Sequence, residues 1–226
     1  MTGTETLTVA VVDDATLVRD SFAHLVPGVR DGGRFARVED LLEAVPEVDL
    51  VVLDLHLSTG GQQVRQGVSA VRLVTRAGYR VCTYSQDERP LVLAACLAAG
   101  ATGVLSKSDP IERVAAALAD VAGGELVAPP AVLGLLDVLV RRRSLTVIGP
   151  RQREVLTGRA RGLSYAQLAT RLHLSESTLR GYWRDLSEQV TRFLDVTTPA
   201  AIEADLGLAP GDLLDLWPGE GLDELG

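Results

Sequence analysis

Five polar residues follow short apolar segments in the first half of the chain, and together their side chains could carry phosphoryl chemistry. They are Asp13, Asp14, Asp54, Ser85 and Lys107. Carboxylates held close together raise one another's pKa unless a cation compensates them, and an oxygen-only ligand set favours Mg²⁺. One carboxylate can then act as a nucleophile and form an acyl phosphate. The serine hydroxyl and the lysine ammonium could bind the phosphoryl oxygens.

Lys107 is the only lysine in a chain that has 21 arginines. Arginine offers a planar fork of donors, whereas lysine offers a compact and mobile ammonium. A special need for an ammonium at this position would explain the choice, and chance explains a single count equally well.

The segments that carry these residues alternate between strand and helix patterns. Strands are predicted at 7–12, 35–38, 49–53, 80–84 and 102–105, helices at 15–26, 39–45, 67–77, 88–99 and 110–122, and a long loop at 58–66. Five alternations predict an α/β fold, a doubly wound, flavodoxin-like parallel sheet of five strands with helices on both faces. The functional crevice of such a sheet lies at the carboxyl ends of its strands, where all five polar residues fall.

The second half of the chain follows a different pattern. Gly123-Gly124 and Pro129-Pro130 interrupt the alternation, and a short helix is predicted at 131–140. Another helix is predicted to begin at Pro150, and the last one to span 199–206. This part is therefore expected to be all-α.

Two further helices carry a recognisable junction. Ser164 opens the first of them, and Gln167 completes a capping box with it. A tight turn at 173–174 leads to Ser175, which can cap a helix running to about residue 190. A short helix, a tight turn and a second helix that bears arginines predict a helix-turn-helix.

Charge divides the chain into three blocks, although its net charge is −8. Residues 1–140 have a net charge of −7, residues 141–192 of +7 and residues 193–226 of −8. A basic block of about fifty residues is the electrostatic footprint expected of a DNA-binding domain.

Residues 6–123 resemble the receiver domains of two-component response regulators. The matching motifs are VVDD (11–14), VVLDL (51–55), the Tyr84-Ser85 pair and GVLSK (103–107). The resemblance implies that Asp54 is the phosphoacceptor, that Ser85 is the switch hydroxyl and that Lys107 contacts the phosphoryl group. It also implies a Mg²⁺ site made by Asp13, Asp14, Asp54 and the backbone carbonyl of His56. Departures from the family pattern are Ser58, the long loop after it, Val104 and Ser108.

Residues 149–208 resemble the LuxR-type helix-turn-helix of NarL/FixJ response regulators, through GPRQREVL (149–156) and GLSYAQLATRLHLSESTLR (162–180). The resemblance implies DNA contacts from Ser164, Ser175, Thr178, Arg180, Gly181 and Arg184. Departures are Gln152, Tyr182 and a lengthened recognition helix, which affect sequence preference more than DNA binding itself.

Four regions are therefore predicted: a receiver domain at 1–123, a linker at 124–148, a helix-turn-helix domain at 149–208 and an acidic tail at 209–226. The tail either solubilises the protein or covers a basic or partner surface through its leucines and Trp217. The chain shows no signal-peptide pattern and no apolar run long enough for a membrane. Two cysteines in apolar contexts agree with a cytoplasmic protein.

We expect a DNA-binding transcriptional response regulator that is switched by phosphorylation of Asp54. The expected partners are double-stranded DNA, a sensor histidine kinase, a second copy in a homodimer and RNA polymerase, with Mg²⁺ as cofactor. The alternative is an atypical regulator of the same architecture, controlled by oligomerisation, a ligand or a partner, which the loop at 58–66 and Val104 favour. An enzyme is not expected, because turnover needs a general acid or base and only His56 lies beside Asp54.

Overall fold

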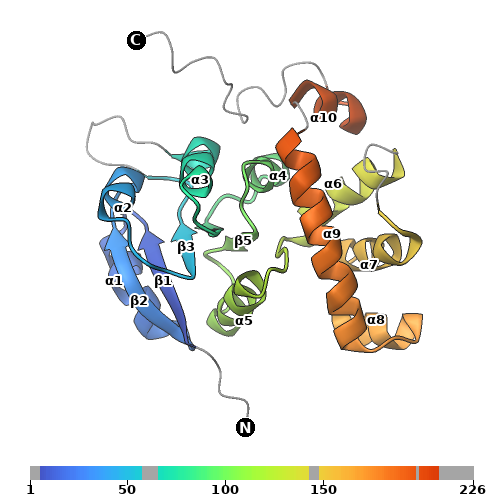
Figure 1. Cartoon of the computed structure of the whole chain (residues 1–226), viewed down its shortest axis with the longest axis horizontal. Helices are drawn as coiled ribbons and strands as arrows, with labels where there is room; N and C mark the ends of the chain where they lie inside the picture. The colour runs from blue at the N-terminus through green and yellow to red at the C-terminus, as the bar shows by residue number, and fades with distance from the viewer. Residues whose placement is uncertain (1–5, 58–65, 143–147, 197–198, 209–226) are drawn as a thin grey trace.

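Five parallel strands form one sheet in the order β2-β1-β3-β4-β5 (Figure 1). Their bounds are β1 Leu7–Val12, β2 Val29–Phe35, β3 Leu50–Leu53, β4 Val81–Ser85 and β5 Gly103–Ser106. The computed structural model describes residues 6–57, 66–142, 148–196 and 199–208. Most of the predicted long loop, residues 58–65, and the predicted acidic tail, residues 209–226, lie outside the described residues. The predicted doubly wound parallel sheet is confirmed.

The side chains of β1 point alternately to the two faces of the sheet, and helices cover both faces. Val9 and Val11 are buried with α1 (Thr16–Leu25) and α5 (Ile111–Ala122) on one face. Ala10 and Val12 are buried on the other face, which α2 (Val38–Ala44), α3 (Gly67–Arg76) and α4 (Pro90–Ala98) cover. Side chains along a strand point alternately to opposite faces, so an unbroken apolar run is what a strand with both faces covered requires.

The second strand is a correction to the sequence analysis, which placed it at 35–38. It spans Val29–Phe35 and pairs only with β1, at the edge of the sheet, with an irregularity in register at Val9/Ala10. Its sequence, VRDGGRF, is polar and contains two glycines, so it has none of the usual strand signals. Gly32 is needed there because a Cβ would lie 2.5 Å from a methyl carbon of Val48.

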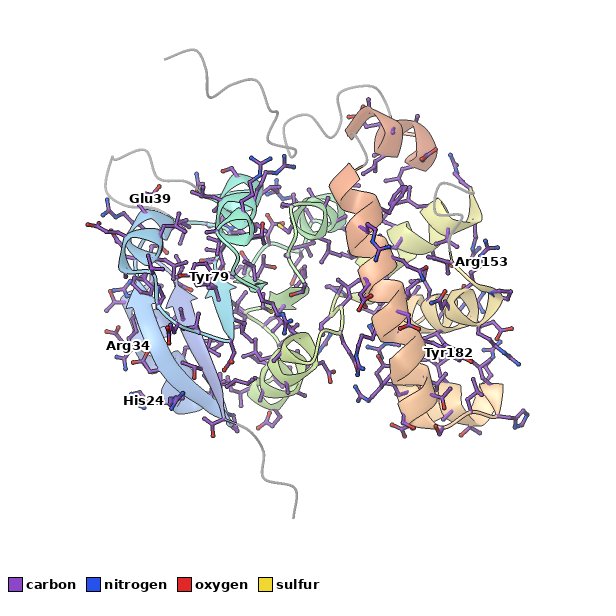
Figure 2. All side chains as sticks on the ribbon, in the orientation of Figure 1. His24, Arg34, Glu39, Tyr79, Arg153 and Tyr182 are labelled. Carbon is purple, nitrogen blue, oxygen red and sulfur yellow. The ribbon has the colours of Figure 1, made fainter. Side chains whose placement is uncertain are left out.

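The remaining described residues form a helical part, here residues 130–208, at the opposite end of the molecule from β2. Figure 2 shows Arg34 and His24 at the β2 edge, and Arg153 and Tyr182 in the helical part. Its helices are α6 Pro130–Arg141, α7 Pro150–Ala160, α8 Tyr165–Leu172, α9 Glu176–Val196 and α10 Pro199–Leu206. The predicted helix at 131–140 and the junction at 173–174 are confirmed, while α9 extends six residues beyond the predicted end.

Helix α4 joins the α/β part, here residues 6–122, to the helical part. It packs against α3 and β5 within the α/β part, and also against α6 and α9 (Figure 1). Its sequence, PLVLAACLA, is apolar all round, and six of its nine residues are buried. A helix that is apolar on every side needs cover on every side. One hydrophobic core therefore runs from the sheet through α4 into the helical part.

No helix among the described residues combines the length and apolar character that crossing a bilayer requires. Both cysteines, Cys82 and Cys96, are buried and unpaired, and burial raises the pKa of each thiol to about 12.

Candidate functional sites: a carboxylate pocket and a docked helix-turn-helix

Asp13, Asp14 and Asp54 meet at the carboxyl edge of the sheet. Asp13 follows β1 and Asp54 follows β3, two neighbouring strands joined where the Asp54 N–H donates to the Val12 carbonyl at 2.9 Å. Asp13 and Asp54 are buried, with 2% and 5% exposed, and Asp14 is half-buried. One carboxylate oxygen from each of the three lies within 4.8 Å of the others. The structure thus brings together the three carboxylates predicted from the sequence.

Lys107 lies between two of these carboxylates. Its Nζ is 2.8 Å from Asp13 Oδ2 and 2.7 Å from Asp54 Oδ2. Burial lowers the pKa of Lys107, but the hydrogen bonds to both carboxylates outweigh it, so the net pKa is raised. Burial also raises the pKa of Asp13, and the bond to Lys107 offsets this only in part. Lys107 is paired with two of the three carboxylates, and the oxygen-only set of Asp13, Asp14 and Asp54 fits a hard divalent cation.

Ser85 and His56 form the rim of this pocket. The hydroxyl of Ser85 lies 3.3 Å from His56 Nδ1 and accepts a hydrogen bond of 3.3 Å from the Asp87 N–H. The His56 N–H donates to Asp54 Oδ1 at 3.3 Å, while its ring is largely exposed. Asp87 is held by a two-pronged pair with Arg89, and the hydrogen bond from Arg89 lowers the pKa of Asp87. A cleft of about 580 Å³ opens here, lined in part by Asp54, His56 and Lys107.

The helix-turn-helix consists of α8, the turn at His173 and α9. Ser164 caps α8: its Oγ accepts the Gln167 N–H at 3.2 Å, and Gln167 Oε1 accepts the Ser164 N–H at 2.8 Å. His173 has a positive φ of 54°, which reverses the chain between the helices. At the start of α9, Ser175 accepts a hydrogen bond of 3.1 Å from the Thr178 N–H. Ser164, Ser175 and Thr178 are exposed.

Three further predicted contact residues lie along α9. Arg184 is exposed, Gly181 is half-buried with open space where a Cβ would stand, and Arg180 is half-buried against the α/β part. Trp183, between them, is fully buried with a 1% exposed fraction. The six predicted residues therefore do not share one free surface.

Arg180 forms ion pairs with acidic residues beyond the helical part. Its Nη1 lies 3.0 Å from Asp120 Oδ1, and 3.2 Å from each carboxylate oxygen of Glu125. The guanidinium also stacks 4.4 Å from the centre of the Tyr165 ring, and the Tyr165 hydroxyl donates to Glu125 at 3.0 Å. Glu125 is buried, with 5% exposed, whereas the Arg180 and Asp120 side chains are 38% and 36% exposed, so the cluster lies at the border between core and solvent.

Residues 125–127, here called the linking segment, lie between β5 and α9. The Val127 carbonyl accepts a hydrogen bond of 2.8 Å from the Val104 N–H in β5. The Val127 N–H donates to the carbonyl of Thr102, just before β5, at 3.0 Å. Leu126 bonds in the other direction: its N–H donates to Ser187 Oγ at 3.0 Å, and its carbonyl accepts the Trp183 Nε1–H at 2.8 Å. The middle of α9 is therefore docked on the edge of the sheet.

The cluster that Glu125, Asp120 and Tyr165 form around Arg180 was not predicted from the sequence. The one available signal was the apolar run at 91–99, because a helix without a polar face needs a second packing partner. That signal predicts a contact between the two parts but does not identify the arginine on the other side.

The chain is similar in sequence to known response regulators and transcriptional regulatory proteins. It is 31% identical over 183 residues to the response regulator RamR of Streptomyces coelicolor, covering 79% of this chain and 86% of RamR. It is 30% identical over 198 residues to the probable transcriptional regulatory protein NarL of Mycobacterium tuberculosis, covering 82% of this chain and 88% of NarL. No family model matches the chain.

Among solved structures, the chain is similar to the two-component response regulator RcsB in a complex with DNA. The TM-score is 0.50 at 19% sequence identity, over 89% of this chain and 98% of that one. At this identity the likeness concerns the fold, a receiver-type sheet followed by a helical domain.

Proposed function

Since the chain belongs to the NarL-type response regulators, we propose that it is a DNA-binding transcription regulator switched by phosphorylation of Asp54. The observation that carries the proposal is that one chain holds both a carboxylate pocket suited to phosphoryl transfer and an arginine-bearing helix docked against the same α/β part. We assign the phosphoacceptor role to residues 1–123, the link between domains to residues 124–148 and DNA binding to residues 149–208.

In the proposed reaction a carboxylate oxygen of Asp54 attacks the phosphorus of a phosphohistidine on a sensor kinase. The P–O bond of an acyl phosphate forms, the P–N bond breaks, and the imidazole leaves. Bound Mg²⁺, held by Asp13, Asp14, Asp54 and the His56 carbonyl, would neutralise charge on the phosphoryl oxygens. Lys107, now paired with Asp13 and Asp54, would exchange one carboxylate partner for a phosphoryl oxygen. Ser85 would donate its hydroxyl to another.

DNA binding is proposed for the surface formed by α8 and the N-terminal half of α9. Ser164, Ser175 and Thr178 would bind phosphates, since hydroxyls and helix N-termini favour anions. Arg180 and Arg184 would reach the major groove or its phosphates. Arg180 cannot do so while it is paired with Glu125 and Asp120, so DNA binding requires the helical part to separate from the receiver.

Helix α4 is the proposed connection between the two events. It begins at Pro90, five residues after Ser85, and packs on α6 and α9 at its other faces. A movement of Ser85 towards a phosphoryl group would shift the segment that precedes α4, and hence the surface on which α9 is docked. The phosphorylated state would be open and dimeric, and would read two half-sites.

The test is the solution mass and DNA affinity of the purified protein, with and without Mg²⁺ plus beryllium fluoride, an acyl-phosphate mimic. The DNA is a duplex selected by the protein from a random pool. We expect the mimic to produce a dimer with higher DNA affinity in the wild type and no change in Asp54→Ala. Binding that is equal with and without the mimic would reject phosphorylation as the switch.

That rejecting outcome would support the second candidate, a regulator of the same architecture that does not use phosphate. One observation favours it. Val104, where the family usually has a movable aromatic residue, is 2% exposed and its N–H is bonded to the Val127 carbonyl at 2.8 Å. A short β-branched side chain in that position has little freedom to change rotamer.

A further inference from the structure

A cleft of about 640 Å³ separates the receiver from α9, at the edge of the sheet opposite the carboxylate pocket. The receiver wall is formed by the end of α4 at Ala98 and by turns, which place Arg80 before β4, Thr102 before β5 and Gly123-Gly124 after α5. The facing wall is the stretch of α9 from Arg184 to Arg192. Because the two walls come from different parts of the chain, the cleft exists only while the helical part is docked.

Positive charge dominates the lining. Arg80 contributes from the receiver, and Arg184 and Arg192 contribute from α9, against a single carboxylate, Glu188. The three α9 residues are spaced by four, so they share one face of the helix. Among the described residues none of these arginines forms an ion pair, and the Arg80 guanidinium donates only to the Ala122 carbonyl. The cleft therefore has three guanidinium groups and an excess of two positive charges.

We propose that this cleft binds a small polyanion, a molecule with two or more phosphate or carboxylate groups, and that the bound anion keeps the two parts docked. Guanidinium groups match the oxygens of such anions with paired hydrogen bonds. An anion that contacts Arg80 together with Arg184 or Arg192 binds the docked arrangement better than the separated one. By linkage it lowers DNA affinity, a consequence that rests on the proposed function, whereas anion binding itself does not.

Calorimetric titration of the full chain with pyrophosphate, without Mg²⁺ and at constant ionic strength, measures the binding directly. We expect saturable binding at one site. Arg80→Gln and Arg192→Gln should each weaken it by about tenfold, as expected for loss of a charge-assisted hydrogen bond. Arg171→Gln is the matched control, since it removes an exposed arginine of α8 outside the cleft, and it should bind as the wild type does. Citrate in place of pyrophosphate distinguishes a carboxylate site from a phosphate site.

Arg80 also separates this proposal from simple competition on the basic face of α9. Arg80 belongs to the receiver, so Arg80→Gln should bind DNA normally and lose the inhibition of DNA binding by pyrophosphate. Inhibition that persists in Arg80→Gln would overturn the proposal, as would unchanged pyrophosphate affinity in that variant, equal losses in the Arg171→Gln control, or no binding to the wild type. If the chain binds no DNA at all, the proposed function fails, and the calorimetric comparison still decides whether the cleft is an anion site.

Discussion

The guanidinium of Arg180 is bound by the carboxylate of Glu125, with Nη1 3.2 Å from both oxygens. Glu125 is almost fully buried, and its second partner is the Tyr165 hydroxyl. Two charged oxygens in front of a guanidinium resemble the phosphate that the same arginine would meet on DNA. Glu125 of the linking segment, together with Asp120 of α5, thus occupies an arginine that the proposed function assigns to the operator.

Glu125→Gln should loosen the docked arrangement and raise DNA affinity in the absence of phosphorylation. The amide keeps the shape and the bond to Tyr165 but removes the charge that holds Arg180. Because Arg180 is 38% exposed, we expect the free energy that favours the docked arrangement to fall by about 1 kcal/mol. Fluorescence anisotropy on the selected duplex measures the change. Glu112→Gln, at an exposed position on α5, serves as the control, and equal affinities in the two variants would contradict this account.

Lys107→Ala should destabilise the receiver and make its stability more dependent on Mg²⁺. The substitution leaves two buried carboxylates without the cation they share, which we expect to cost about 3 kcal/mol. Urea unfolding with and without Mg²⁺ measures both effects, and added metal should restore more stability in the variant than it adds to the wild type. Lys107→Arg keeps the charge but not the compact ammonium, so it should fall between the two. A variant as stable as the wild type without metal would disprove the pairing as a stabilising contact.

Gly158→Ala should destabilise the helical part by about 1–3 kcal/mol. A Cβ at this position of α7 would lie 2.3 Å from Leu168 Cδ2, and Leu168 is itself 1% exposed and has little room to move. Gly134→Ala on α6 is the matched control: nothing lies within 4 Å of its Cβ. An alanine there should stabilise the protein by up to about 1 kcal/mol. Thermal or urea unfolding of the two variants should therefore give opposite signs.

Asp120→Asn should flatten the pH dependence of stability in mildly acidic solution. Burial, and then the charge of Glu125, raise the pKa of Asp120 above its ordinary 3.8, with Arg180 offsetting part of the effect. The folded state therefore holds this proton more tightly than the unfolded state. The contribution of Asp120 to stability is full below pH 3.8 and is lost as the pH rises through the raised pKa. The free energy of unfolding of the wild type relative to Asp120→Asn should fall over that window, and a rise would show the sign to be wrong.

Alkylation of the two cysteines should require unfolding. Both thiols are buried and have a pKa raised to about 12, so little thiolate is present near neutral pH. Incubation with a thiol reagent in native buffer should leave both cysteines unmodified, and denaturant should expose two equivalents. Rapid labelling of native protein would indicate local opening around β4 or α4.

The carboxylate pocket was predictable because parallel strands force their carboxyl ends to one edge. The apolar runs before Asp13 and Asp54 fix where those strands end, so the side chains must meet there. The cap at Ser164 and the turn at 173–174 were predictable from local sequence, since helix capping depends on residues three positions apart.

Two features were not predictable from local patterns. Strand β2 carries no apolar alternation, because an edge strand with one neighbour can be polar and this one also needs glycine beside Val48. The position of Arg180 depends on Glu125, 55 residues earlier in the chain, and no local pattern encodes such a pair. Arginine on an amphipathic helix looks the same in sequence whether it faces DNA, solvent or another domain.

The linking segment gives α9 a double constraint. Trp183 and Ser187 hold the backbone of Leu126, while Arg180 lies one turn earlier on the same helix. If the proposed function is right, a substitution on this helix that alters operator preference also alters the fraction of DNA-free protein in which the helical part has separated from the receiver. Selection for operator preference and selection for low DNA binding without phosphorylation therefore act on the same few side chains, so a change in one property also changes the other.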